Sequence, residues 1–185
     1  MALSIKNFKT KNLLIGSAFL LFILVTAKKT VNKYLQKMSN QEFIKFIYPY
    51  AKTIGDKLGI PAIFLVSQIC LETNFGKSLL FTKYFNVGGV KAVKGQNFVS
   101  LPTYEYIKGV KTKINQNFAS YNSLIDGLAG YSKIFQNKYF KQYLNKTNDP
   151  NQYVILLQSG SPKYATDIHY ITKIQNLNKT VSNLV

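Results

Sequence analysis

The sequence predicts a mainly α-helical α+β domain with a small β-hairpin lobe, preceded by an N-terminal hydrophobic helix. The chain has 185 residues, of which 46% are hydrophobic and 17% charged, and this suits one globular domain with its own core. Apolar residues recur at helical spacing in several capped segments, whereas only residues 98–118 are rich in strand-favouring residues. The same composition excludes a multispan membrane protein and a disordered chain.

Residues 1–27 are the first segment, in which a lysine-containing region is followed by a hydrophobic one. The uncharged run over residues 12–27 would be about 24 Å long as a helix, shorter than the ~30 Å hydrocarbon core of a bilayer. The segment therefore favours a signal peptide, with Val25-Thr26-Ala27 as the cleavage site, and an uncleaved membrane anchor is the close alternative. Either interpretation predicts an exported protein that lies in the periplasm, in the cell wall or on the membrane.

The first helix of the folded domain is expected to begin near Asn40. Ser39 and Glu42 have the spacing of a capping box, and apolar residues then recur at helical spacing. Pro49 lies inside this pattern, so we expect the helix to kink or restart there before it ends by Gly59.

A second helix is expected over residues 62–73, led by Pro61. It is apolar nearly all round, which predicts that it forms the centre of the core. Asn74 and Gly76 end the helix, and the glycine-rich residues 86–91 are expected to form a loop.

The strand-favouring stretch predicts a hairpin over residues 98–118, because two apolar and aromatic runs flank Lys108-Gly109. Three further helices are expected behind capping residues: from Leu124 after Asn122 or Ser123, from Pro150 after Asp149, and from Ile168 after Asp167. No internal repeat or low-complexity linker interrupts this order. We therefore expect one domain over residues 39–185 behind a basic tether of residues 28–38.

The charge is strongly positive and comes from lysine alone. The 24 basic residues, all lysines, outnumber seven acidic ones, which gives a net charge of +17. Without arginine, specific nucleic-acid recognition is disfavoured. The lysines would attract any anionic polymer, and the charge alone does not choose between nucleic acid, a membrane surface of anionic lipid and anionic wall polymers. An AT-rich genome is an equal explanation for the abundance of lysine. Cys70 and His169 are the only residues of their types, too few for a metal cluster or a Cys-His nucleophile, so we expect no metal and no cofactor.

Seven acidic residues are few enough to assign individually. Five occupy helix caps, a first turn or a polar patch, which leaves Glu72 and Glu105. Glu72 follows Ile69 by three residues on the apolar face of the second helix, so we expect it to be buried with a raised pKa, as a general acid requires. A glutamate neutralised by a lysine ion pair is the alternative. Glu105, on the hairpin, either overhangs a cleft or faces water.

Several motifs together resemble the bacterial glucosaminidase family, the peptidoglycan hydrolases of glycoside hydrolase family 73. The strongest is residues 71–78 (LETNFGKS), which resembles the family signature ES-x-W-G-K-S. Four weaker ones follow in the family's order: residues 86–91 (NVGGVK), 103–106 (TYEY), 118–123 (FASYNS) and 164–167 (YATD). The resemblance extends over about residues 43–178.

The resemblance implies a lysozyme-like domain that cleaves the β-1,4 bond from N-acetylglucosamine to N-acetylmuramic acid in peptidoglycan glycan strands. It implies that Glu72 is the general acid and that Glu105 is a second carboxylate, unless the substrate N-acetyl group supplies the nucleophile. It also implies substrate-binding roles at or beside the sugar for Phe75, Asn86, Tyr104 and Tyr164.

The chain departs from the family pattern at several positions, and other functions remain open. Phe75 replaces a tryptophan, Gly88 a phenylalanine, Ala119 an arginine and Ile168 a proline. A lytic transglycosylase or a muramidase on the same glycan is the nearest alternative chemistry. A noncatalytic wall-binding module would be favoured by an ionised, salt-bridged Glu72, and a general polyanion-binding protein is disfavoured by the absence of nucleic-acid motifs.

Overall fold

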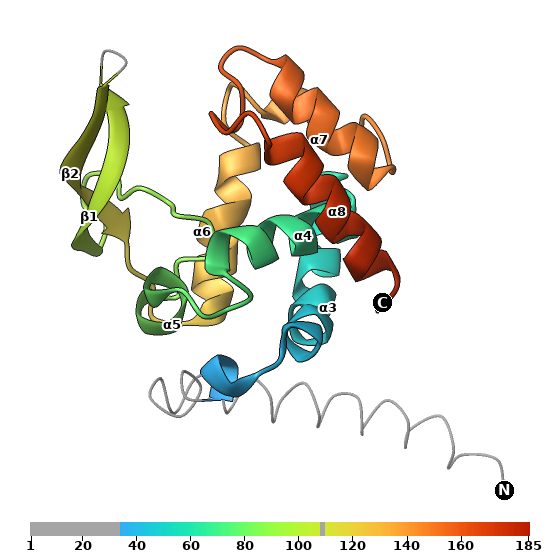
Figure 1. The fold of residues 1–185 in the computed structure, drawn as a ribbon, viewed down its shortest axis with the longest axis horizontal. Coiled ribbons are helices and arrows are strands. Elements are labelled where there is room, and N and C mark those ends of the chain that lie inside the picture. The colour runs from blue at the N-terminus through green and yellow to red at the C-terminus, as the bar shows by residue number, and fades with distance from the viewer. Residues whose placement is uncertain (1–33, 108–109) are drawn as a thin grey trace, which may run out of the picture.

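The structure is a computed structural model that describes residues 34–107 and 110–185. A body of helices surrounds α4, and one β-hairpin stands at its side (Figure 1). The elements are α3 (Asn40–Leu58), α4 (Ala62–Thr73), α5 (Leu79–Tyr84), β1 (Phe98–Ile107), β2 (Val110–Ala119), α6 (Leu124–Phe135), the 3-10 helix η1 (Lys141–Tyr143), α7 (Pro150–Ser159) and α8 (Tyr170–Ser182). The predicted α+β class with a hairpin lobe is confirmed.

The proposed signal peptide or anchor, residues 1–27, lies outside the described residues. Within the described part of the chain, no helix is both long and apolar enough to cross a membrane. Of the predicted tether, residues 34–37 form a helical turn. Leu35 is fully buried and Met38 is 8% exposed, so the core begins before residue 39.

Helix α4 is the centre of the core, as its sequence predicts. It packs against α3, α7 and α8. Residues 64–70 are all buried, an unbroken run of seven that no surface helix could have. The helix carries no charged residue before its last turn, so every side can contact other elements without burying an unpaired charge.

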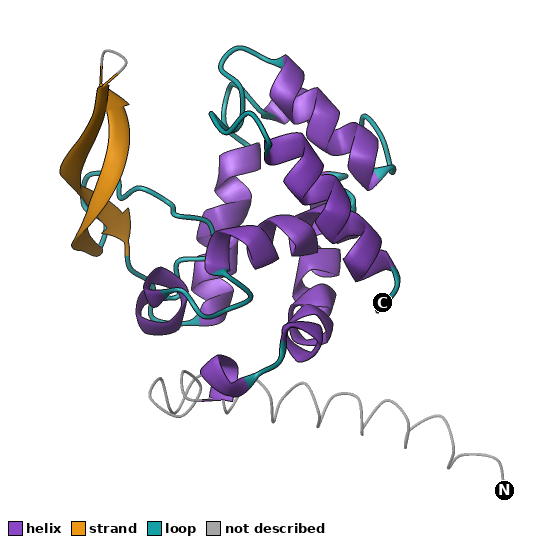
Figure 2. Cartoon of the chain, in the orientation of Figure 1, coloured by secondary structure: helices purple, strands orange, loops and turns teal. Residues whose placement is uncertain are grey.

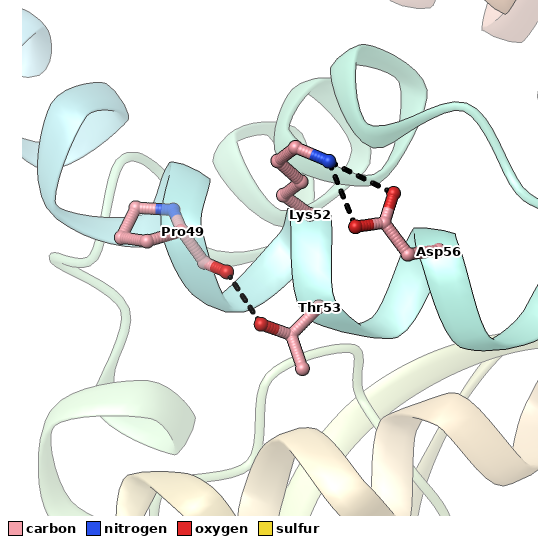
Figure 3. Close-up of polar contacts among 4 residues, drawn as sticks. All are labelled: Pro49, Lys52, Thr53 and Asp56. Carbon is pink, nitrogen blue, oxygen red and sulfur yellow. Dashed lines mark hydrogen bonds and ion pairs between the residues drawn. The ribbon is translucent and has the colours of Figure 1, made fainter.

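Helix α3 confirms the predicted capping box and the predicted end at Gly59, but it does not restart at Pro49. The helix continues through this proline as one element. Thr53 Oγ1 donates a hydrogen bond to the Pro49 carbonyl oxygen at 3.0 Å, and Lys52 pairs with Asp56 at 2.7 Å (Figure 3). The buried face extends on both sides of the proline and packs on α4, so tertiary packing outweighs the one lost backbone hydrogen bond.

The hairpin pairs β1 with β2 from Phe98–Ala119 to Ile107–Val110, which confirms the predicted hairpin. Its base is attached to the preceding loop, because Ala92 N–H donates to the Asn117 oxygen at 2.9 Å and Ala119 N–H to the Val90 oxygen at 2.8 Å. Beyond this base the two strands extend away from the helices (Figure 2).

One helix was not predicted, and the start of another differs from the sequence prediction. Helix α5, capped by Ser78, was not predicted, because its six residues are too short to show a helical period. Helix α8 begins at Tyr170, two residues after the predicted start. The Asp167 carboxylate accepts a hydrogen bond from the His169 N–H at 2.9 Å and so closes a turn before the helix.

Helix α6 approaches the backbone of the loop after α5 at a single glycine. A Cβ atom on Gly127 would lie 1.9 Å from the Phe85 carbonyl oxygen. This contact lets α6 pack against the segment that follows α5. Any residue larger than glycine at position 127 would prevent this close approach.

We expect Gly127→Ala to lower the free energy of unfolding by about 2 kcal/mol because the methyl group overlaps a backbone atom. Helix propensity alone predicts the opposite sign, a gain of about 1 kcal/mol. Urea denaturation followed by circular dichroism measures the change. Ala129→Gly, at an exposed position of the same helix, is the control and should lose about 1 kcal/mol through propensity. A stabilised Gly127→Ala protein would contradict the contact.

Candidate active site

Glu72 lies in the last turn of α4, at the end of the helix that faces the hairpin side of the body (Figure 1). Its side chain is exposed, which corrects the prediction that it would be buried. The apolar residues of α4 surround the helix almost completely, so they could not indicate which direction Glu72 faces. Its neighbour Thr73 is fully buried. The buried helix α4 therefore ends in a carboxylate that is accessible to solvent.

The electrostatic environment of Glu72 nevertheless favours its protonated form. Desolvation by the surrounding protein raises the pKa of Glu72, although one side of the carboxylate remains open to solvent. The negative end of the α4 dipole acts in the same direction. Among the described residues, no lysine lies within ion-pair distance of Glu72, so the alternative of a salt-bridged glutamate is not observed there.

The backbone after Glu72 makes an unusual turn that Thr73 stabilises. Asn74, Phe75 and Gly76 all have left-handed φ angles, of 49°, 51° and 76°. Thr73 Oγ1 donates to the Ile69 oxygen at 2.6 Å and accepts from the Gly76 N–H at 2.9 Å. Two consecutive non-glycine residues in this conformation store strain that the surrounding contacts must offset.

Phe75 therefore occupies a defined position directly after the carboxylate. Its side chain is half-buried and packs against the core cluster. Gly76 has no room for a side chain, because a Cβ atom there would lie 2.4 Å from the Phe43 ring. The motif around Glu72 is thus a tightly packed turn that presents one exposed acid and one partly exposed aromatic ring.

A buried polar network lies one helical turn before Glu72 and was not predicted. Gln68, fully buried on α4, donates from Nε2 to the Tyr170 hydroxyl at 2.7 Å and accepts from the Tyr131 hydroxyl through Oε1. The Gln68 amide also interacts with the hydroxyl of Tyr164. A glutamine inside an apolar helix is the signal that would have indicated the network, since a buried amide needs partners.

The three tyrosines of this network lie within electrostatic reach of Glu72. Burial is the main cause that raises the pKa values of Tyr131, Tyr164 and Tyr170, and the charge of Glu72 raises them further. All three hydroxyls therefore stay protonated at neutral pH; the Tyr131 hydroxyl donates to Gln68, and the Tyr170 hydroxyl accepts from it.

Tyr164, one of the predicted site residues, lies within electrostatic reach of Glu72. Its ring stacks on Phe135 with centroids 5.9 Å apart and an interplanar angle of 8°, and it also contacts Phe140 at 5.2 Å. The ring remains half-exposed. A phenol clamped in this way presents a fixed donor and a partly open aromatic surface.

Asn86 lies in the predicted loop, where its side chain is engaged with the protein backbone. The side chain is 1% exposed. Its Nδ2 donates to the Val90 and Ala119 oxygens, both at 2.8 Å, and its Oδ1 accepts from the Val90 N–H at 2.8 Å. These bonds leave no free amide for a sugar, so Asn86 can influence substrate binding only by shaping the loop.

The hairpin residues are placed by their backbone pairing. Tyr104 pairs with Lys113 in the sheet and is 59% exposed. Glu105 pairs with Thr112, and its side chain lies outside what the structure describes. The role of Glu105 stays a prediction.

The described residues contain no group of three or more His, Cys, Asp or Glu side chains that could hold a metal ion. Burial raises the pKa of the Cys70 thiol to about 12, so this thiol stays protonated and is a poor nucleophile.

Known proteins resemble this chain over most of its length. Residues 48–183 match the protein family described as mannosyl-glycoprotein endo-beta-N-acetylglucosaminidase. Exo-glucosaminidase LytG of Bacillus subtilis is 28% identical over 185 residues, covering 91% of this chain and 64% of LytG. Peptidoglycan hydrolase FlgJ of Pseudomonas aeruginosa is 30% identical over 146 residues, covering 75% of this chain and 36% of FlgJ.

A solved structure supports the same relationship. A mutant peptidoglycan hydrolase from Sphingomonas sp. A1 superposes with a TM-score of 0.66 and is 28% identical, covering 78% of this chain and 97% of that one. The two curated relatives are longer, so the chain spans less than two thirds of the length of either.

We expect Glu72→Gln to increase the stability of the fold at neutral pH. A raised folded-state pKa means that the native state binds the proton more tightly, so wild-type stability falls as pH rises above about 4.5 toward the folded-state pKa. Glutamine does not titrate and avoids this loss. Melting temperatures at pH 7 and pH 3.5 measure this difference in stability. The melting temperature of the variant should be higher than that of the wild type at pH 7, and the difference should shrink at pH 3.5. A variant that is less stable at pH 7 would contradict the desolvated carboxylate.

We expect Gln68→Leu to cost about 2–4 kcal/mol of unfolding free energy, because it leaves buried tyrosine hydroxyls without a partner. Tyr131→Phe removes one of those hydroxyls and completes a double-mutant cycle. Tyr131→Phe should destabilise the wild type but cost less in the Gln68→Leu background. Additive effects in urea denaturation would exclude the coupling between these two side chains.

Proposed function

Because this chain belongs to the glucosaminidase family, we propose that it is a glycosidase that hydrolyses the β-1,4 bond between N-acetylglucosamine and N-acetylmuramic acid in peptidoglycan. The observation that carries the proposal is the state of Glu72, an exposed carboxyl with a raised pKa at the end of a buried helix. Relatives named as a glucosaminidase and as a peptidoglycan hydrolase support the choice of bond and polymer.

In the proposed reaction, Glu72 acts as the general acid. It donates its proton to the glycosidic oxygen as the bond to the anomeric carbon breaks, and water completes the hydrolysis. Its raised pKa keeps a larger fraction of the carboxyl protonated near neutral pH than an ordinary glutamate would have. The Tyr164 hydroxyl, within electrostatic reach of Glu72, is protonated and its ring is fixed by aromatic stacking, so it is suited to orient the carboxyl or the sugar.

The group that stabilises the positive charge at the anomeric carbon has two candidates. Glu105 on β1 supplies a second carboxylate if the hairpin brings it to the sugar, and the substrate N-acetyl group supplies an internal nucleophile if it does not. We keep Glu105 as a catalytic candidate of smaller weight than Glu72.

Sugar binding is proposed to depend on aromatic surfaces near the acid. Phe75, three residues after Glu72, and Tyr164, within electrostatic reach of it, are both partly exposed, and Tyr104 is exposed on the hairpin. Such rings stack on the apolar faces of sugars. Asn86 contributes by holding the loop between α5 and the hairpin.

The cellular setting is also a proposal. Residues 1–27 would export the chain or anchor it to the membrane, and the lysine-rich surface would attract it to anionic wall polymers. Both features place a glycan hydrolase next to its substrate.

We expect Glu72→Gln to reduce hydrolysis of purified peptidoglycan at least about a hundredfold, because the amide cannot donate the proton. Glu105→Gln should reduce it less. Glu42→Gln is the matched control, since Glu42 is an exposed glutamate engaged only in the capping box. The experiment measures soluble products after each variant is shown to fold. Near-wild-type activity of Glu72→Gln would contradict the acid assignment.

Mass analysis of the same products identifies the bond. The proposal requires fragments with N-acetylglucosamine at the reducing end. Reducing-end muramic acid would indicate a muramidase, 1,6-anhydromuramic acid a transglycosylase, and no product a noncatalytic wall-binding module. The length distribution separates internal cleavage from the terminal cleavage that the name of LytG indicates.

A further inference from the structure

A preformed pocket of about 670 Å³ lies between the loop that precedes the hairpin and helix α6. Its volume is in the ~300–1,000 Å³ range of pockets that hold small ligands. The lining comes from residues 90, 91 and 93–96, from Tyr121 and from one face of α6 that includes Asp126, Gly130 and Lys133. Neither Glu72 nor any predicted sugar-contacting residue lines it.

The loop side of the pocket is held in place by hydrogen bonds. Val93 N–H donates to the Gln96 side-chain oxygen at 3.3 Å, and Gln96 N–H donates to the Val93 carbonyl at 3.1 Å. Gly130 makes room for the Tyr121 ring, because a Cβ atom there would lie 2.0 Å from the Tyr121 hydroxyl. A ligand would therefore meet a rigid cavity with little ordering cost.

The charge of the pocket is positive on two sides. Lys91 and Lys94 come from the loop and Lys133 from α6, whereas Asp126 is the one carboxylate in the lining. The Asp126 carboxylate accepts a hydrogen bond from the Ser123 hydroxyl at 2.7 Å, within the cap of α6. Two lysine-bearing walls that face one cavity favour a ligand with two separated anionic groups.

Apolar side chains separate these cations. Val90, Val93 and Ile134 contribute to the lining, and Val93 is 71% exposed. A phosphate polymer with a hydroxylated backbone has no apolar groups that could pack on these side chains. A short peptide that carries both carboxylates and methyl groups matches both parts of the lining.

We propose that this pocket binds the acidic stem peptide of peptidoglycan, with Lys94 and Lys133 contacting its carboxylates. The inference deepens the proposed function and depends on it for the identity of the polymer. Two contacts connect the loop and helix α6 to the helix that carries Glu72. Gly88, in the same loop, packs on Tyr131 of α6, and Tyr131 bonds to Gln68 one turn before Glu72. A peptide held in the pocket would add to the affinity for glycan strands that carry it.

Binding of a labelled muramyl pentapeptide to the full chain tests the proposal. The probe carries its dye on the lysine side chain, which leaves two carboxylates, and a second probe has both carboxylates amidated. The variant is Lys94→Gln/Lys133→Gln, and the matched control is Lys83→Gln/Lys179→Gln, which removes the same charge at exposed positions outside the pocket. Fluorescence anisotropy gives each dissociation constant.

We expect the acidic probe to bind the wild type about tenfold more tightly than the diamide, and the pocket variant to lose about that factor. The control variant should change binding less than twofold. Equal affinity for both probes, or an equal loss in both variants, would overturn the proposal. A competition experiment compares unlabelled peptide with poly(glycerol phosphate), with the concentration of each expressed as that of its anionic groups. If poly(glycerol phosphate) displaces the probe at the lower concentration, the proposal is overturned in favour of a phosphate ligand.

Hydrolysis separates this inference from the proposed function. The pocket variant should cleave peptide-stripped glycan at the wild-type rate, whereas its KM for peptide-bearing glycan should rise about tenfold. An equal loss on both substrates would contradict a peptide site. If the wild type cleaves neither substrate, the proposed function fails, and the anisotropy measurement still decides whether the pocket binds the peptide.

Discussion

The complete burial of α4 is the constraint on which the rest of the structure depends. A helix without charge along most of its length can exist only inside the protein, so α3, α7 and α8 must pack around it. Glu72 is tolerated because it lies in the last turn, where the packing ends and one side opens to solvent. The packing of the core helices therefore fixes the position of the candidate acid, so this position does not depend on the conformation of the loops.

Gln68 extends this constraint into the site. A buried amide is costly without partners, and here it is bonded by tyrosines from α6 and α8 and interacts with Tyr164 from the segment between α7 and α8. Elements distant in sequence are thereby brought together directly behind the carboxyl. Burial raises the pKa of Tyr164 and so keeps it protonated, and the rings of Phe135 and Phe140 hold it in place.

The sequence predicted most of the fold, because capping residues and helical periods are local signals. Asp149 and Ser123 indicate helix starts that the structure confirms. Interactions distant in sequence were not predictable in this way: Pro49 continues a helix because of packing on α4, and the exposure of Glu72 depends on where neighbouring helices end. The Gln68 network joins residues about a hundred positions apart, and no spacing rule indicates such a pair.

The hairpin described above is a sheet that consists only of edges. Beyond the base, where residues 90–92 pair with β2, each strand has an outer side along which another extended chain could add, the situation that leads to aggregation in many β proteins. Pro102 removes a backbone donor from β1, and Lys113 places an exposed charge on β2. A proline and an exposed lysine are two usual protections of an edge strand against pairing with another extended chain.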